Sequence, residues 1–139
     1  MSFREKSAWV MGTLMVGAGL YYLNLAVAAS RELGWAAPPV AIFIPFTLLV
    51  VIASVASQTT IAILSPKDAS APADERERPL IDRAGHWSGL VLGAGAVTSL
   101  LHFSYHQDGV LLFHSIMGSL ILSHVAEYAF QITLIRRNS

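Results

Sequence analysis

The sequence predicts an all-α, polytopic membrane protein: a single domain, residues 1–139, folded as an up-down four-helix transmembrane bundle. The chain is 54% hydrophobic and only 13% charged, whereas soluble domains are about 25% charged. Four long apolar segments each exceed the roughly 20 residues that cross the hydrocarbon core of a bilayer. The predicted spans are residues 8–29, 39–64, 84–106 and 109–135.

The basic residues predict how the four spans are oriented. Eight of the nine Lys and Arg residues lie before the first span, between the second and third, or after the fourth, and only Arg31 lies on the other side. Cytoplasmic loops carry the excess of Lys and Arg in membrane proteins. We therefore expect both termini and the loop 65–83 to be cytoplasmic, in a bacterial inner (plasma) membrane.

The first two spans have different flanking signals. The first follows Arg4 and Lys6 and ends near Ala26-Val27-Ala28, which resembles a signal-peptide cleavage site. Its apolar stretch, about 22 residues, is longer than the 7–15 of a signal peptide, so we expect it to be a retained helix. The second span starts at Pro39, and proline is tolerated in the first turn of a helix.

The third and fourth spans are expected to form an antiparallel hairpin. Gln107-Asp108-Gly109 predicts a tight turn between them, with Gly109 available for a positive φ. Small residues spaced by four let membrane helices approach closely. We expect such residues to face other helices of the bundle, with a homodimer through the glycines as the alternative. They are Gly85, Gly89 and Gly93 on the third span, and Ser115, Ser119 and Ser123 on the fourth.

A cluster of polar residues is predicted inside the cytoplasmic half of the bundle. Glu127 lies nine residues before Arg136, about 13 Å along a helix. Ionisable groups at such depth usually face a bundle interior and mark functional sites. His124, Gln131 and Gln58 are expected beside Glu127. Two interpretations remain open: a structural hydrogen-bond cluster, or a site that handles protons or a small ligand.

A second candidate site lies at the opposite end of the hairpin. His102, His106 and His114, together with Asp108, are expected at similar depth, and imidazole suits Zn, Cu and Ni. Haem is less favoured, because its axial ligands approach from opposite faces, whereas packed helices stand only about 8–10 Å apart. The alternative is that these histidines are ordinary interfacial or hydrogen-bonded residues.

Composition narrows the classes of function. There are no cysteines and the formal net charge is zero, so thiolate metal sites and nucleic-acid binding are not expected. No nucleophile–base pair that would indicate an enzyme is identifiable. The sequence favours a non-enzymatic membrane module for sensing or metal handling, with a small carrier, channel or immunity-type protein as the alternative.

Several motifs carry a resemblance to a known family. They are Ala73-Asp74-Glu75-Arg76-Glu77-Arg78 followed by Arg83-Ala84-Gly85-His86, then His106-Gln107-Asp108-Gly109, Leu112-Phe113-His114 and Ala126-Glu127-Tyr128. The chain resembles small four-span bacterial inner-membrane proteins of unknown function. Pro79 departs from the family pattern, in which the acidic–basic stretch runs uninterrupted into the third span.

The expected partners follow from this interpretation. The lipid bilayer is the first, and a homodimer or a larger membrane complex, in which the chain is a subunit, is also consistent with the sequence. The loop 65–83 is a candidate docking site for a cytoplasmic partner, and the alternative is a solvated connector.

Overall fold

The computed structural model describes residues 3–33, 39–66, 75 and 77–137, and it is all α. Four long helices account for nearly all of these residues. They are α1 (Phe3–Leu33), α2 (Pro39–Leu64), α4 (Glu77–His106) and α5 (Gly109–Arg137).

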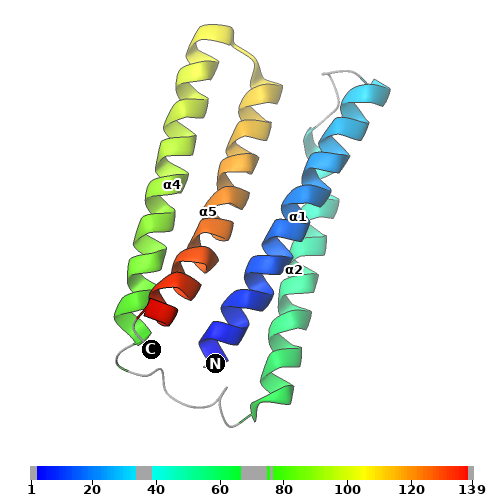
Figure 1. Cartoon of the computed structure of the whole chain (residues 1–139). Helices are drawn as coiled ribbons and strands as arrows, with labels where there is room; N and C mark the ends of the chain where they lie inside the picture. The colour runs from blue at the N-terminus through cyan, green and yellow to red at the C-terminus, as the bar shows by residue number, and fades with distance from the viewer. Residues whose placement is uncertain (1–2, 34–38, 67–74, 76, 138–139) are drawn as a thin grey trace.

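The helices form a bundle in which α5 is central (Figure 1). α5 packs along α4 on one side and along α1 on the other, and α2 packs against α1. Within the described residues, no other pair of helices is in comparably extended contact. Both ends of the chain lie at one end of the bundle, called here the terminal end, and the α4–α5 turn lies at the other, the hairpin end.

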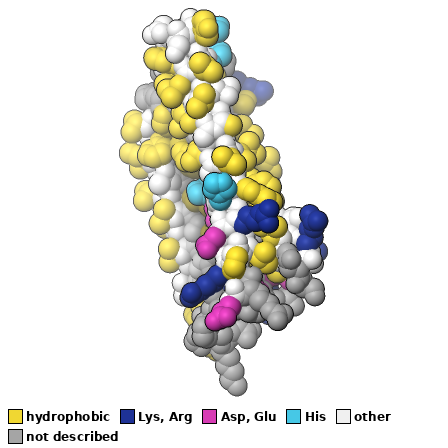
Figure 2. Space-filling model, turned by 90° about the vertical axis from the view of Figure 1, so that its left-hand side faces the viewer, with side chains coloured by type: hydrophobic (Ala, Val, Ile, Leu, Met, Phe, Trp, Pro, Cys, Tyr) yellow, Lys and Arg dark blue, Asp and Glu magenta, His cyan; other side chains and the backbone are white. Residues whose placement is uncertain are grey.

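All four helices are long and apolar enough to cross a membrane. Only 11–17% of the residues in each apolar window are buried inside the chain, so most of their side chains must be covered by something else. Large side chains such as Leu20, Ile52 and Leu64 are 64%, 66% and 76% exposed. Figure 2 shows hydrophobic side chains along the length of one face, with most of its charged groups near the lower end. The chain is therefore a multi-pass integral membrane protein.

Three helices extend beyond the spans predicted from hydropathy, α5 only slightly, to Arg137. α1 begins at Phe3 and ends at Leu33, and α4 begins at Glu77, which places Pro79 in its first turn. A proline there removes only an amide that would lack a helical partner. The predicted docking loop 65–83 is shortened accordingly, and residues 67–74 and 76 of it lie outside the described residues.

The α4–α5 turn differs from the prediction in one detail. Gln107, not Gly109, has a positive φ, of 53°, while Gly109 is already the first residue of α5. Asp108 precedes the helix, and its Oδ1 accepts a hydrogen bond from the backbone N–H of Leu111 at 3.0 Å. This side-chain cap satisfies one of the free amides at the start of α5.

A cluster of buried hydrophobic residues lies toward the hairpin end, where α1, α2 and α5 meet. Its buried residues are Ala18, Tyr22, Ile42, Phe46 and Met117. The ring of Tyr22 contacts that of Phe46 edge-on, with the centroids 5.1 Å apart. Phe43 and Phe113 make a similar contact between α2 and α5. We call the five buried residues, Ala18, Tyr22, Ile42, Phe46 and Met117, the aromatic core.

The glycine ridge predicted to face another helix makes no close contact with another helix in the part of the chain that the structure describes. A Cβ built at Gly85, Gly89 or Gly93 would meet no atom within 4 Å outside its own helical turns. The close approach of α4 to α5 is instead at Gly95, where a Cβ would lie 2.6 Å from the Cβ of Ser119. The ridge therefore does not form the α4–α5 contact, and its packing against another helix, in the bundle or in a homodimer, stays a prediction.

The predicted serine stripe does lie toward the rest of the bundle. Ser119 meets Gly95, and Ser123 is buried. The hydroxyls of Ser115, Ser119 and Ser123 all donate to carbonyls of α5 itself, at 2.7–3.0 Å. The serines thus contribute to packing by their small size rather than by hydrogen bonds between helices.

Charged residues connect helices at the terminal end. Nε of Arg136 on α5 donates to Oε1 of Glu5 on α1 at 2.9 Å, and its guanidinium lies 5.4 Å from the centroid of Trp9. Arg4 of α1 lies 3.6 Å from Glu77 of α4. Charged and aromatic side chains at helix ends are typical of a membrane–water boundary.

Candidate functional site: a polar row on α5

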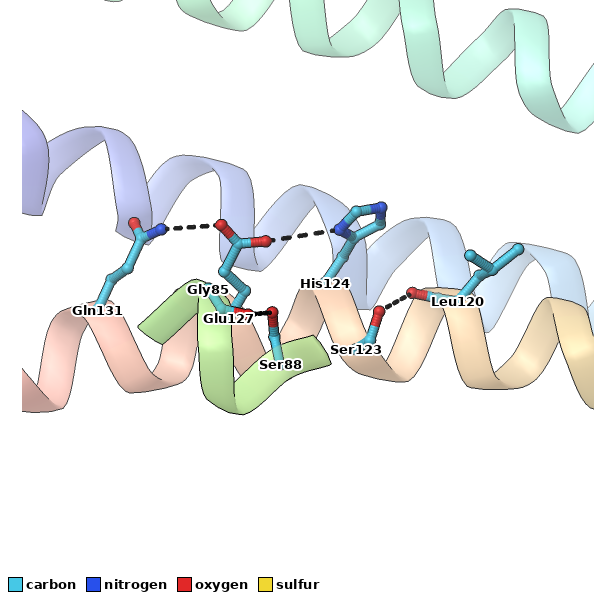
Figure 3. Close-up of polar contacts among 7 residues, drawn as sticks. All are labelled: Gly85, Ser88, Leu120, Ser123, His124, Glu127 and Gln131. Carbon is cyan, nitrogen blue, oxygen red and sulfur yellow. Dashed lines mark hydrogen bonds and ion pairs between the residues drawn. The ribbon is translucent and has the colours of Figure 1, made fainter. Parts of the chain in front are cut away.

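Three of the residues predicted to form the inner polar cluster lie together on α5 (Figure 3). His124, Glu127 and Gln131 are spaced by three and four positions, so they fall on one side of a helix. Nε2 of Gln131 donates to Oε1 of Glu127 at 3.2 Å. Nδ1 of His124 lies 3.7 Å from Oε2 of the same carboxyl group. We call these three residues the α5 polar row; Figure 3 shows their side chains in line along the helix.

The two oxygens of Glu127 therefore have different partners. One accepts a hydrogen bond from an amide that cannot titrate, and the other faces an imidazole that can. At 3.7 Å the carboxyl and the imidazole are within ion-pair distance but too far apart for a hydrogen bond. They can form an ion pair or remain two neutral groups, and a proton would pass between them only after the side chains move closer. This is the chemistry that the arrangement allows.

The α5 polar row is less enclosed than the sequence predicted. The side chain of Glu127 is 29% exposed and that of His124 is 54% exposed, measured against the rest of the chain. Both lie well inside a candidate membrane span. The row is therefore partly open at a depth where a polar group is costly.

Gln58 does not belong to the row. It pairs with Ser7 across α1 and α2: the Gln58 amide donates to Oγ of Ser7 at 2.9 Å, and Oγ of Ser7 donates to Oε1 of Gln58 at 3.2 Å. The sequence placed Gln58 at a suitable depth but did not indicate which helix it would face. Its contacts are those of a residue that holds two helices together.

The four residues of the predicted metal site have separate contacts. The rings of His102 and His106 stack, with the centroids 4.2 Å apart. Nδ1 of His114 lies 2.6 Å from the hydroxyl of Tyr22, and Asp108 caps α5. Within the described ranges, no group of three or more His, Asp or Glu residues is placed to hold a metal ion. A metal centre from these residues stays a prediction that would require rearrangement.

The contact between Tyr22 and His114 was not predicted from the sequence. Tyr22 is 2% exposed and belongs to the aromatic core, and its ring also lies 5.9 Å from that of His114. Both residues were visible as polar groups within apolar spans. Their pairing depends on how α1 packs against α5, which the periodicity of neither helix specifies. We call Tyr22 and His114 the outer pair.

Glycines on α1 were a usable signal for that packing. A Cβ at Gly12 would lie 3.2 Å from the Cβ of Tyr128, and one at Gly19 would lie 2.9 Å from Cγ2 of Ile121. Glycines at these positions let the backbones of α1 and α5 approach closely. The glycine series on α4 is longer and more regular, so it was the stronger signal in the sequence.

Comparison with models of protein families, with curated proteins and with solved structures found no match to this chain.

Proposed function

We propose that this protein is a non-enzymatic membrane module in which the α5 polar row takes up and releases a proton. One observation carries the proposal: Glu127 lies inside a membrane span, yet its two polar contacts among the described residues are to side chains of its own helix. An ionisable residue at membrane depth is costly and is usually kept for function. Because these two contacts do not connect one helix to another, a contribution to the stability of the bundle does not explain why Glu127 is present.

The proton site rests on the two partners of Glu127. Nε2 of Gln131 donates a hydrogen bond to one oxygen of Glu127, and the other oxygen faces His124. His124 can receive the proton that Glu127 releases, and it is the more exposed of the two side chains. A change of protonation would alter the charge on one side of α5 without breaking contacts between helices.

Infrared spectroscopy tests the proposal directly. Acidification of the protein in bilayers is expected to produce a carboxylic-acid C=O band that is missing from Glu127→Gln. Glu32→Gln is the matched control, because Glu32 is an exposed carboxylate near the end of α1. Identical pH-difference spectra for the wild type and Glu127→Gln would overturn the proposal.

Sensing and transport differ in whether the proton crosses the membrane. Liposomes that enclose a pH-sensitive dye distinguish the two. A sensor is expected to leave the internal pH unchanged, whereas a carrier or channel would give a flux that Glu127→Gln abolishes. The same proton site serves either case, and co-purification of a stoichiometric second chain would indicate a subunit of a larger complex.

The proposal includes an orientation: the terminal end faces the cytoplasm of a bacterial inner membrane. It is supported by the eight basic residues on that side of the spans and by the resemblance to small bacterial inner-membrane proteins. The chain contains no cysteine, so single cysteines can be introduced cleanly. A thiol at Glu75 should be shielded from an impermeant reagent in intact cells, and one at Asp108 should react.

Metal handling is the weaker candidate. It would need His114 to leave Tyr22 and Asp108 to leave the N-terminus of α5. The metal content of the purified protein tests it: about one Zn, Cu or Ni per chain, lost when His102, His106 and His114 are replaced by Ala, would support a metal site.

A further inference from the structure

A groove between α1 and α5 lies beside the outer pair and plays no part in the proton site. It has a volume of about 440 Å³, within the 300–1,000 Å³ typical of small-molecule sites. It follows the two helices from Ala26 and His114 to Met15 and Val125. We call it the α1–α5 groove.

The groove has one polar end and is apolar elsewhere. Tyr22 and His114 lie at or near the end toward the hairpin, and the remaining lining residues are aliphatic side chains, Met15 and glycines. His114 and Val125 are separated by eleven positions on α5, about 16 Å along the helix. The shape therefore matches a molecule with a small polar head and a hydrocarbon tail.

The side chains at the edge of the groove face the lipid. Leu20, Leu23 and Leu122 line it and are 64%, 59% and 59% exposed. A ligand could enter sideways from the bilayer without passing through water. The described residues that line the groove include no Lys, Arg, Asp or Glu, so a neutral head suits it better than a phosphate or a carboxylate.

The outer pair supplies a hydrogen-bond donor in either tautomer of His114. If the Tyr22 hydroxyl donates to Nδ1, the other ring nitrogen carries the proton and can donate. If Nδ1 is protonated and donates to the Tyr22 oxygen, the tyrosine O–H remains available. Both residues line the groove, so a head with an acceptor oxygen is the complementary partner.

Space for a ring lies directly beside this donor. Gly118 is one helical turn beyond His114 and lines the groove, and a Cβ built there meets no atom within 4 Å. We propose that the α1–α5 groove binds a neutral, lipid-soluble quinone. A ring carbonyl accepts the hydrogen bond from the outer pair, the ring lies over Gly118, and the tail extends toward Met15 and Val125.

Decylubiquinone binding to the purified protein in detergent tests the proposal. We expect about one quinone per chain. Gly118→Leu should lower the affinity about tenfold or more, because its side chain fills the space of the ring. Gly17→Leu is the matched control: Gly17 is on α1, also has no atom within 4 Å of a built Cβ, and does not line the groove.

A ringless competitor distinguishes a quinone site from a seat for any hydrocarbon chain. 1-Decanol has the same tail length and should displace decylubiquinone poorly, since it lacks the ring. Displacement of decylubiquinone by an equal concentration of 1-decanol would overturn the quinone assignment. It would show that the groove binds hydrocarbon chains without selecting the ring. Unchanged quinone affinity in Gly118→Leu would overturn the groove as the site.

A thiol-protection experiment covers the case in which Gly118→Leu does not fold. Because the chain has no cysteine, Gly118→Cys carries a single thiol within the groove. Decylubiquinone, whose ring is fully substituted and so does not add thiols, should slow its reaction with a maleimide but not that of Gly17→Cys. Equal rates for Gly118→Cys with and without quinone would contradict the proposal.

Discussion

Two polar groups on α5 differ in what they connect. The outer pair joins α5 to α1, through a contact of 2.6 Å within the aromatic core. The polar contacts of the α5 polar row run along one helix, at 3.2 and 3.7 Å, and the row is partly exposed. A polar contact between helices can be explained by its contribution to packing. One that stays within a single helix, at membrane depth, needs another explanation.

The surroundings of the two groups differ in the same way. Around the outer pair, rings from α1, α2 and α5 meet edge-on. The α5 polar row lies nearer the terminal end, where the helices are connected by charged pairs such as Arg136 with Glu5. We therefore expect substitutions at the hairpin end to change stability and substitutions in the row to change protonation.

The largest effect on stability is expected in the aromatic core. Phe46→Ala removes a ring that contacts Tyr22 and leaves a cavity, at a cost of about 3–5 kcal/mol in the free energy of unfolding. Leu48→Ala, at a side chain 57% exposed, should cost less than about 0.5 kcal/mol. Unfolding in mild detergent measures both. Equal costs would mean that the aromatic core does not hold the bundle together.

The hydrogen bond of the outer pair should have a smaller effect. Tyr22→Phe keeps the ring contact with Phe46 but removes the hydroxyl that pairs with His114. Hydrogen bonds between membrane helices contribute about 0.6 kcal/mol on average and at most about 1.7. Unfolding should become easier by an amount in this range. An unchanged free energy of unfolding would mean that the hydrogen bond of the outer pair does not stabilise the bundle.

The ion pair at the terminal end should contribute less still. Arg136→Gln removes the contact with Glu5, but the arginine side chain is 58% exposed. Ion pairs exposed to solvent contribute about 0.2–1 kcal/mol and weaken with salt. The difference between Arg136→Gln and the wild type should therefore shrink as the salt concentration rises. A difference independent of salt would show that packing against Trp9, not charge, is the main contribution.

The sequence predicted the helices well because hydropathy over a whole span needs only local information. The α5 polar row was also predictable, since the spacing of His124, Glu127 and Gln131 lies within one helix. Gln58 was misplaced because its neighbour depends on the rotation of α2 about its axis. The α4–α5 contact was not predicted for a related reason. The two helices approach closely at a single glycine, Gly95, opposite Ser119, and not at the longer glycine series.

The free energy of unfolding of Glu127→Gln, measured beside Tyr22→Phe, tests the central claim most directly. Gln keeps the size of Glu127 and its ability to accept from Gln131, but it cannot exchange the proton. If the α5 polar row serves protonation rather than the fold, Glu127→Gln should express normally and unfold within about 0.5 kcal/mol of the wild type. A loss larger than that of Tyr22→Phe would show that Glu127 holds the bundle together and would contradict the account.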